Sequence, residues 1–199
     1  MRRVVVLAIL ALALPLGAWA GTITLANQYG TISISNSGVV SKGSELTAFN
    51  GITAPKGHDL GFVSFSTGGL TSGSWAAGGT LSSVGSTFTI ISMGKYGQPH
   101  GTIFSGSFVG PITLKLVTQM PHGAVWTLTG QIQGMYNGHI VTGTTTQTLY
   151  STSSQLAGGI GHIRVGSSSV EAPEPGTLGL LGTGLVGIAG MFRRKLMRA

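Results

Sequence analysis

Carboxylates are scarce in this sequence, and their scarcity limits the chemistry that the chain could perform. Of its 199 residues four are Asp or Glu, and only Glu45 and Asp59 precede residue 166. Glycoside hydrolysis generally needs two carboxyl groups at a set separation, so these two residues would have to form the pair. Calcium sites also usually draw on several carboxylates. A hydrolase that uses Glu45 or Asp59 is therefore the weakest functional hypothesis, behind the two non-catalytic ones given below.

Five histidines are the other candidates for acid–base or metal chemistry, and they show no motif. None lies in a His-x-His or His-Glu-x-x-His pattern, and the chain has no cysteine. No Gly-x-Ser-x-Gly stands between a strand and a helix, and the Gly-rich stretches lack the Lys-Ser/Thr ending of a phosphate loop. The sequence therefore predicts no catalytic residue, no metal site and no cofactor. The histidines are His58, His100, His122, His139 and His162.

Aromatic side chains make binding harder to exclude than catalysis, because their rings present flat apolar faces to a sugar. Trp126 is in register with Leu128 and Ile132, which predicts a core position. Trp75 instead lies in a Gly- and Ser-rich segment, residues 67–85, and is the candidate ligand platform. The simpler interpretation of Trp75 is a loop side chain that covers the edge of a sheet.

The elements that must position these residues are strands. Apolar residues alternate with Thr and Ser, as at Ile23 and Leu25 or at Ile112, Leu114 and Leu116, and no helical period appears between residues 21 and 173. We expect an all-β domain, an antiparallel β-sandwich or jelly roll of roughly ten short strands. For residues 67–85 we expect a long surface loop or an edge hairpin, with stacked β-solenoid rungs as the alternative. Further strands are expected at 60–67, 86–93, 102–108, 112–118 and 162–165.

The clearest local prediction is a hairpin at Asn137-Gly138. Asn and Gly tolerate the positive φ that a two-residue turn requires, so residues 124–136 and 139–150 should pair. This register places Tyr136 opposite His139 and Ile132 opposite Gly143, where an aromatic ring could fill the gap. Asn50-Gly51 predicts a second, shorter hairpin.

The first twenty residues have the pattern of a signal peptide. A positive start at Arg2 and Arg3 precedes an apolar run of about thirteen residues, and Ala18-Trp19-Ala20 supplies the small residues that flank a cleavage site. We expect cleavage after Ala20. The β-rich domain then occupies residues 21–165, and a short polar linker occupies residues 166–172.

The net charge of +7 arises at the two ends of the chain. Between residues 21 and 192 five cations face four anions. The high isoelectric point thus gives no reason to expect nucleic-acid binding.

The C-terminal segment, residues 173–198, combines three parts without a gap. Pro173-Glu174-Pro175 should be extended, because proline fixes φ and removes a backbone donor. An uncharged apolar run follows, with a helix expected at about 177–192. The apolar run from Leu178 to Phe192 spans about 22 Å as a helix, short of the roughly 30 Å hydrocarbon core, so it makes a marginal transmembrane helix. A basic tail at 193–198 then stops transfer through Arg193, Arg194, Lys195 and Arg198.

This arrangement resembles the PEP-CTERM sorting domain of exported proteins in Gram-negative bacteria that make extracellular polysaccharide. The resemblance covers only about the last twenty-seven residues. It implies recognition and cleavage by exosortase, an integral-membrane enzyme. It also implies export through the inner membrane, anchoring before processing, and display at the cell surface or release. An ordinary single-span anchor is the alternative for the segment. Our leading hypothesis is a non-enzymatic exported matrix protein, and a carbohydrate-binding module acting on exopolysaccharide is the second.

Overall fold

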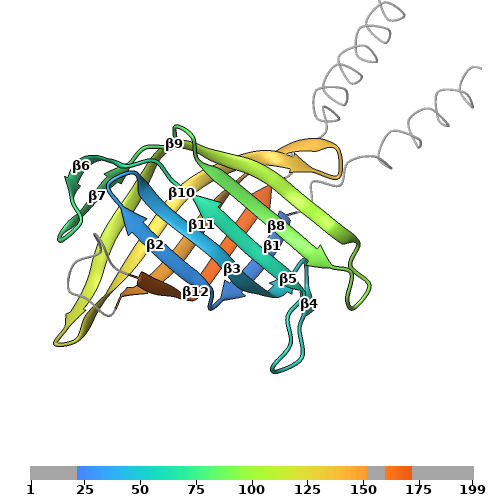
Figure 1. The fold of residues 1–199 in the computed structure, drawn as a ribbon. Helices are drawn as coiled ribbons and strands as arrows, with labels where there is room; N and C mark the ends of the chain where they lie inside the picture. The colour runs from blue at the N-terminus through green and yellow to red at the C-terminus, as the bar shows by residue number, and fades with distance from the viewer. Residues whose placement is uncertain (1–21, 152–159, 172–199) are drawn as a thin grey trace, which may run out of the picture. The chain divides into compact units, whose positions relative to one another are not determined.

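The computed structural model describes residues 22–151 and 160–171, and its regular structure there consists of strands in one antiparallel sheet (Figure 1). No helix in these residues is long and apolar enough to cross a membrane. The strands are β1 (Thr22–Gln28), β2 (Thr31–Ser35), β3 (Gly38–Phe49), β4 (Ile52–Thr53), β5 (Gly61–Ser66), β6 (Leu70–Ser74), β7 (Gly78–Leu81), β8 (Thr87–Met93), β9 (His100–Met120), β10 (Gly123–Tyr136), β11 (His139–Ser151) and β12 (Ile160–Glu171).

The sheet closes on itself. Its main path runs β10-β11-β12-β1-β3-β5-β8-β9, and β9 pairs with β10 to complete an eight-stranded barrel. The all-β, antiparallel prediction is confirmed, but the two-layer sandwich or jelly roll is not what the strands form. Alternation shows only that each strand has one buried face, and a sandwich and a barrel share that property. Closure depends on pairings between distant segments, which the alternation does not encode.

The predicted hairpin is confirmed in its register. Tyr136 pairs with His139 and Ile132 with Gly143, and the turn residues Asn137 and Gly138 have φ of 47° and 80°. The Asn50-Gly51 hairpin is present as well, between β3 and β4. At Gly143 the space that a Cβ would take is filled by the β12 backbone. A Cβ there would lie 2.1 Å from the Ser169 carbonyl oxygen, so the glycine lets the β12 backbone approach.

Strand β9 joins two segments that the sequence predicts as separate strands. Its first half pairs with β8 and its second half pairs with β7. Gly110 lies at the changeover with φ of 71°, beside a register shift in the pairing with β10. This bulge turns the strand without ending it. The β6–β7 hairpin confirms the edge hairpin expected within residues 67–85.

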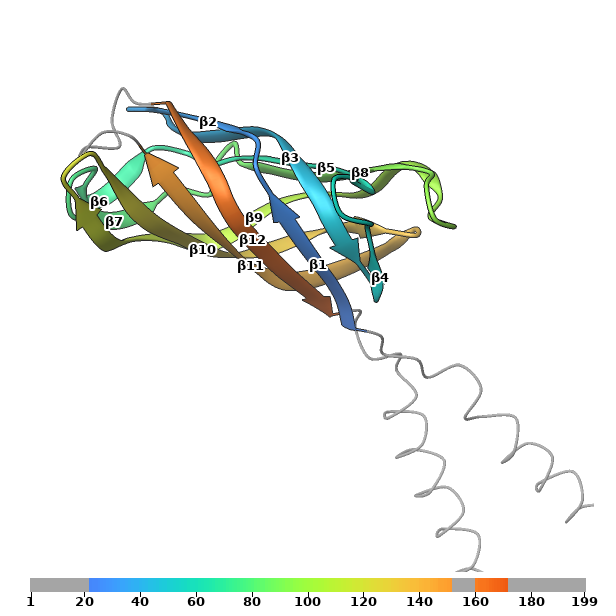
Figure 2. The ribbon, with the colours of Figure 1, turned by 90° about the horizontal axis from the view of Figure 1, so that it is seen from below.

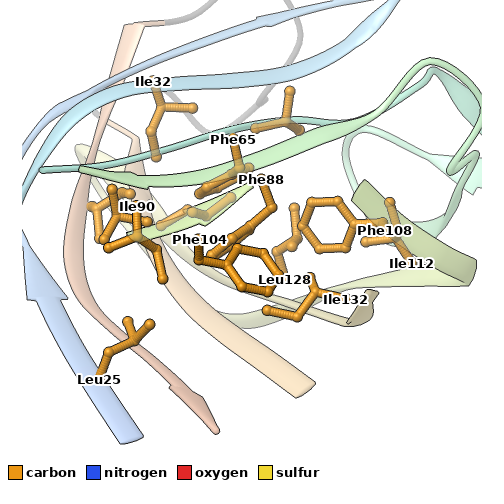
Figure 3. Packing of buried hydrophobic residues seen from close by; sticks show 14 of the residues in the cluster. Leu25, Ile32, Phe65, Phe88, Ile90, Phe104, Phe108, Ile112, Leu128 and Ile132 are labelled. Atoms are coloured by element: carbon orange, nitrogen blue, oxygen red, sulfur yellow. The ribbon is translucent and has the colours of Figure 1, made fainter. Parts of the chain in front are cut away.

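The barrel interior contains a cluster of apolar side chains (Figure 3). Phe88 lies at the centre of an aromatic group, with ring centroids 5.9–6.1 Å from those of Phe65, Phe104 and Phe108. Trp126 is fully buried, as its register predicts. Phe108 and Phe104 pack over two glycines of β10, Gly130 and Gly134, where a Cβ would collide with the rings.

A buried polar network lies on the opposite part of the wall, across β3, β1, β11 and β12. The side-chain amides of Asn27 and Gln147 donate to each other's carbonyl oxygens, at 3.0 and 3.3 Å, and Asn27 also donates to Ser44 at 2.7 Å. Gln147 donates to Thr145, which accepts a further bond from Ser168. These side chains are at most 4% exposed. Because their polar groups pair with one another, the hydrogen bonds of the network offset the energetic cost of removing these groups from water.

The predicted linker at 166–172 needs correction. Residues 166–171 form the end of β12 and pair with both β1 and β11. A run of Gly and Ser suggests a linker when composition is considered alone, but Gly166 and Ser168 face the polar network, where small residues fit. The predicted signal peptide, the transmembrane helix and the basic tail lie outside the described residues.

Candidate functional site

The sorting segment begins directly after the folded domain. Strand β12 ends at Glu171, two positions before Pro173. The motif residues Pro173, Glu174 and Pro175 lie outside the described part of the chain. So do the basic residues Arg193, Arg194, Lys195 and Arg198, and the cleavage-site residues Ala18 and Ala20.

Trp75 lies in the turn that joins β6 to β7. Its side chain is half-buried and packs against the apolar cluster of the barrel. The β6–β7 hairpin extends the sheet beyond the closed barrel, and β7 pairs there with β9. The side chain therefore packs against the core at the tip of the β6–β7 hairpin and stays partly accessible. Its role as a ligand platform stays a prediction.

The two early carboxylates occupy different elements. Glu45 is half-buried on the outer side of β3, where its neighbours in register are Gln28 and Phe62. Asp59 lies in the loop before β5, and its Oδ1 is 3.8 Å from Lys95 Nζ. This placement brings Asp59 within ion-pair distance of Lys95, an interaction that contributes little to stability at a surface site.

The five histidines are all exposed and lie on separate turns and strand ends. Within residues 22–151 and 160–171, no group of three or more His, Cys, Asp or Glu side chains could hold a metal ion. His162 makes one specific contact, since its Nδ1 lies 3.2 Å from the Gly30 carbonyl oxygen. The others make no hydrogen bond with described residues that would orient them for catalysis.

One shallow groove was not predicted from the sequence. It has a volume of about 310 Å³ and lies between the start of β9 and the β10–β11 turn. Its lining mixes hydroxyl, imidazole and amide groups with apolar side chains and contains no acid. Sequence reasoning missed the groove because it brings together the start of β9 and the end of β10, the two far ends of one long hairpin. The lining residues are Pro99, His100, Thr102, Ile103, Ser105, Met135, Asn137 and Gly138.

Residues 171–195 match the family model of the PEP-CTERM protein-sorting motif. The match includes Pro173-Glu174-Pro175, the apolar run and the first three basic residues, so the resemblance noted from the sequence is confirmed. Comparison with curated proteins gave no significant match, and comparison with solved structures gave none. The chain therefore carries a PEP-CTERM sorting motif C-terminal to a closed β domain in the sequence.

Proposed function

We propose that this chain is a non-enzymatic exported protein of the cell surface or extracellular matrix, sorted by exosortase through its PEP motif. The observation that carries the proposal is the PEP-CTERM match at residues 171–195. The motif suggests export and membrane-associated processing in a Gram-negative bacterium. The chain would be anchored in the inner membrane before processing. Exosortase and the membrane would be its partners, and nucleic acid would not be one.

The composition of the domain supports a non-catalytic role. Among the described residues Asp59 is engaged with Lys95, Glu45 stands alone on an outer strand face, and the histidines are dispersed.

Loss of exosortase from the native host tests the sorting part of the proposal. The precursor should then accumulate in the inner-membrane fraction, while the wild-type strain yields a shorter product outside that membrane. Equal distribution and equal size of the chain in both strains would rule out sorting by exosortase.

Conservative amide substitutions test the non-enzymatic part. The variant Glu45→Gln/Asp59→Asn should behave as the wild type in every property except the lost Lys95 ion pair, which is worth at most about 1 kcal/mol at a surface site. A polysaccharide-hydrolysing activity that the wild type shows and this variant lacks would identify the chain as a hydrolase.

A carbohydrate-binding module acting on exopolysaccharide is the second candidate, favoured by the partly exposed ring of Trp75. Trp75→Ala should weaken retention in a polysaccharide affinity gel. Since the ring also packs against the core, it should lower the unfolding midpoint as well. Trp75→Leu separates the two effects, because leucine keeps apolar contact but offers no aromatic face. Unchanged retention of both variants would remove Trp75 as the platform.

A further inference from the structure

Three neighbouring strands change face at the same level of the barrel wall. Figure 2 shows β1 between β12 and β3. In β3, Lys42 and Gly43 are both exposed although they are consecutive. In β12, Arg164 and Val165 are likewise both exposed. The short connection between β1 and β2 lies between these two positions. An irregularity of this kind turns side chains out of the ordinary in–out alternation of a strand.

Tyr29 occupies that connection in a strained conformation. Its φ is 61° and that of Gly30 is 84°. The chain uses the same pair of positive φ values at Asn50-Gly51, Tyr96-Gly97 and Asn137-Gly138, and asparagine tolerates the left-handed region well. A tyrosine there is unfavourable, since its bulky side chain has no local hydrogen bond to offset the strain. Tyr29 is nevertheless 59% exposed, so burial of the ring does not offset the strain either.

Cationic side chains and an imidazole lie on the strands on either side of Tyr29. Asn27 pairs with Gly166 and Thr31 with His162, so Tyr29 stands opposite Arg164 on β12. On the other side Thr31 pairs with Lys42, which places an ammonium group on β3. The imidazole of His162 lies against the Gly30 carbonyl at 3.2 Å.

Lys42 and Arg164 make no ion pair with another described residue, in contrast to Lys95. The acid nearest in register is Glu45, opposite Gln28. Val165, 56% exposed, adds apolar surface beside Arg164. The exposed tyrosine therefore stands opposite Arg164 and next to the Thr31–Lys42 pair, and neither cation pairs with an acid among the described residues. Farther along β1 and β12 the outward side chains of Thr24 and Ser169 carry hydroxyl groups.

We propose that Tyr29, Lys42, His162 and Arg164 form a binding surface for a carboxylate-bearing sugar chain. The ring stacks on a sugar face, Arg164 and Lys42 bind carboxylates, and Thr24 and Ser169 bond hydroxyl groups along the chain. The unpaired cations favour an acidic glycan over a neutral one. This inference rests on the carbohydrate-binding candidate above and places the binding surface at Tyr29.

The variant Tyr29→Asn tests the proposal because it should move stability and binding in opposite directions. In the full chain, purified in mild detergent, it should raise the unfolding midpoint by about 2–4 °C by relieving the strain. It should also weaken retention by a polygalacturonate affinity gel at least tenfold. Tyr96→Asn is the matched control, since Tyr96 has φ of 55° before Gly97 and lies in another loop. It should raise the midpoint similarly and leave retention unchanged.

Two further gels identify the ligand chemistry. Dextran, a neutral sugar polymer, and polyglutamate, an acidic polymer without sugar, should both retain the chain at least tenfold more weakly than polygalacturonate. Retention by polyglutamate equal to that by polygalacturonate would overturn the proposal, because charge alone would explain it. Polygalacturonate retention that depends on Trp75 and not on Tyr29 would overturn this inference and leave the carbohydrate-binding candidate standing. No retention by either sugar polymer would remove both.

Discussion

Gly166→Ala should lower the free energy of unfolding by about 2–4 kcal/mol, because a side chain at this position enters the buried amide pair. A Cβ on Gly166 would lie 2.0 Å from Gln147 Oε1 and 2.3 Å from Asn27 Oδ1. Both amides are fully enclosed, so neither has room to move away, and separating them leaves buried polar atoms without partners. Chemical denaturation monitored by tryptophan fluorescence measures the effect.

Ser167→Ala is the control for that experiment. Ser167 is the next residue of β12, and its side chain is exposed on the outer face. Its loss should change stability by no more than about 0.5 kcal/mol. If residues 166–172 were a linker, the two substitutions would have the same negligible effect. Equal stability of both variants and the wild type would therefore contradict the place of β12 in the barrel.

Replacing Pro173, Glu174 and Pro175 together by alanine should reduce processing of the chain in its native host at least tenfold. The two prolines lack a backbone N–H donor, and all three residues lie within the segment that matches the sorting family. The ratio of precursor to product on immunoblots of membrane and external fractions measures the effect.

Ser169→Ala, an exposed position of β12 outside the matched residues, is the control and should be processed as the wild type. Normal processing of the triple variant would show that the family match does not reflect use of the motif by the cell. Loss of processing in both variants would point instead to a misfolded domain.

Local chemistry made part of this fold predictable from the sequence. Asn137-Gly138 fixes both the turn and the register of β10 with β11, because only a two-residue turn with positive φ suits that pair. The alternation around Trp126 likewise identifies its buried face. Both predictions depend on residues that are close in the chain, where propensity and sterics act directly.

Features that depend on distant segments were not predictable in this way. Barrel closure rests on β12 pairing with β1, in which Glu171 lies opposite Thr22 from the other end of the domain. The polar residues of β12 resemble a linker until Asn27 and Gln147 lie beside them. The strain at Tyr29 becomes visible only when its φ is known, because tyrosine followed by glycine is not a preferred signal for such a turn.

Mass spectrometry of the mature protein from its native host tests the central claim most directly. We predict a chain that begins at Gly21 and lacks the C-terminal basic tail, recovered outside the inner membrane. A full-length chain that starts at Met1, retains Arg198 and resides in the cytosol would contradict export and sorting together.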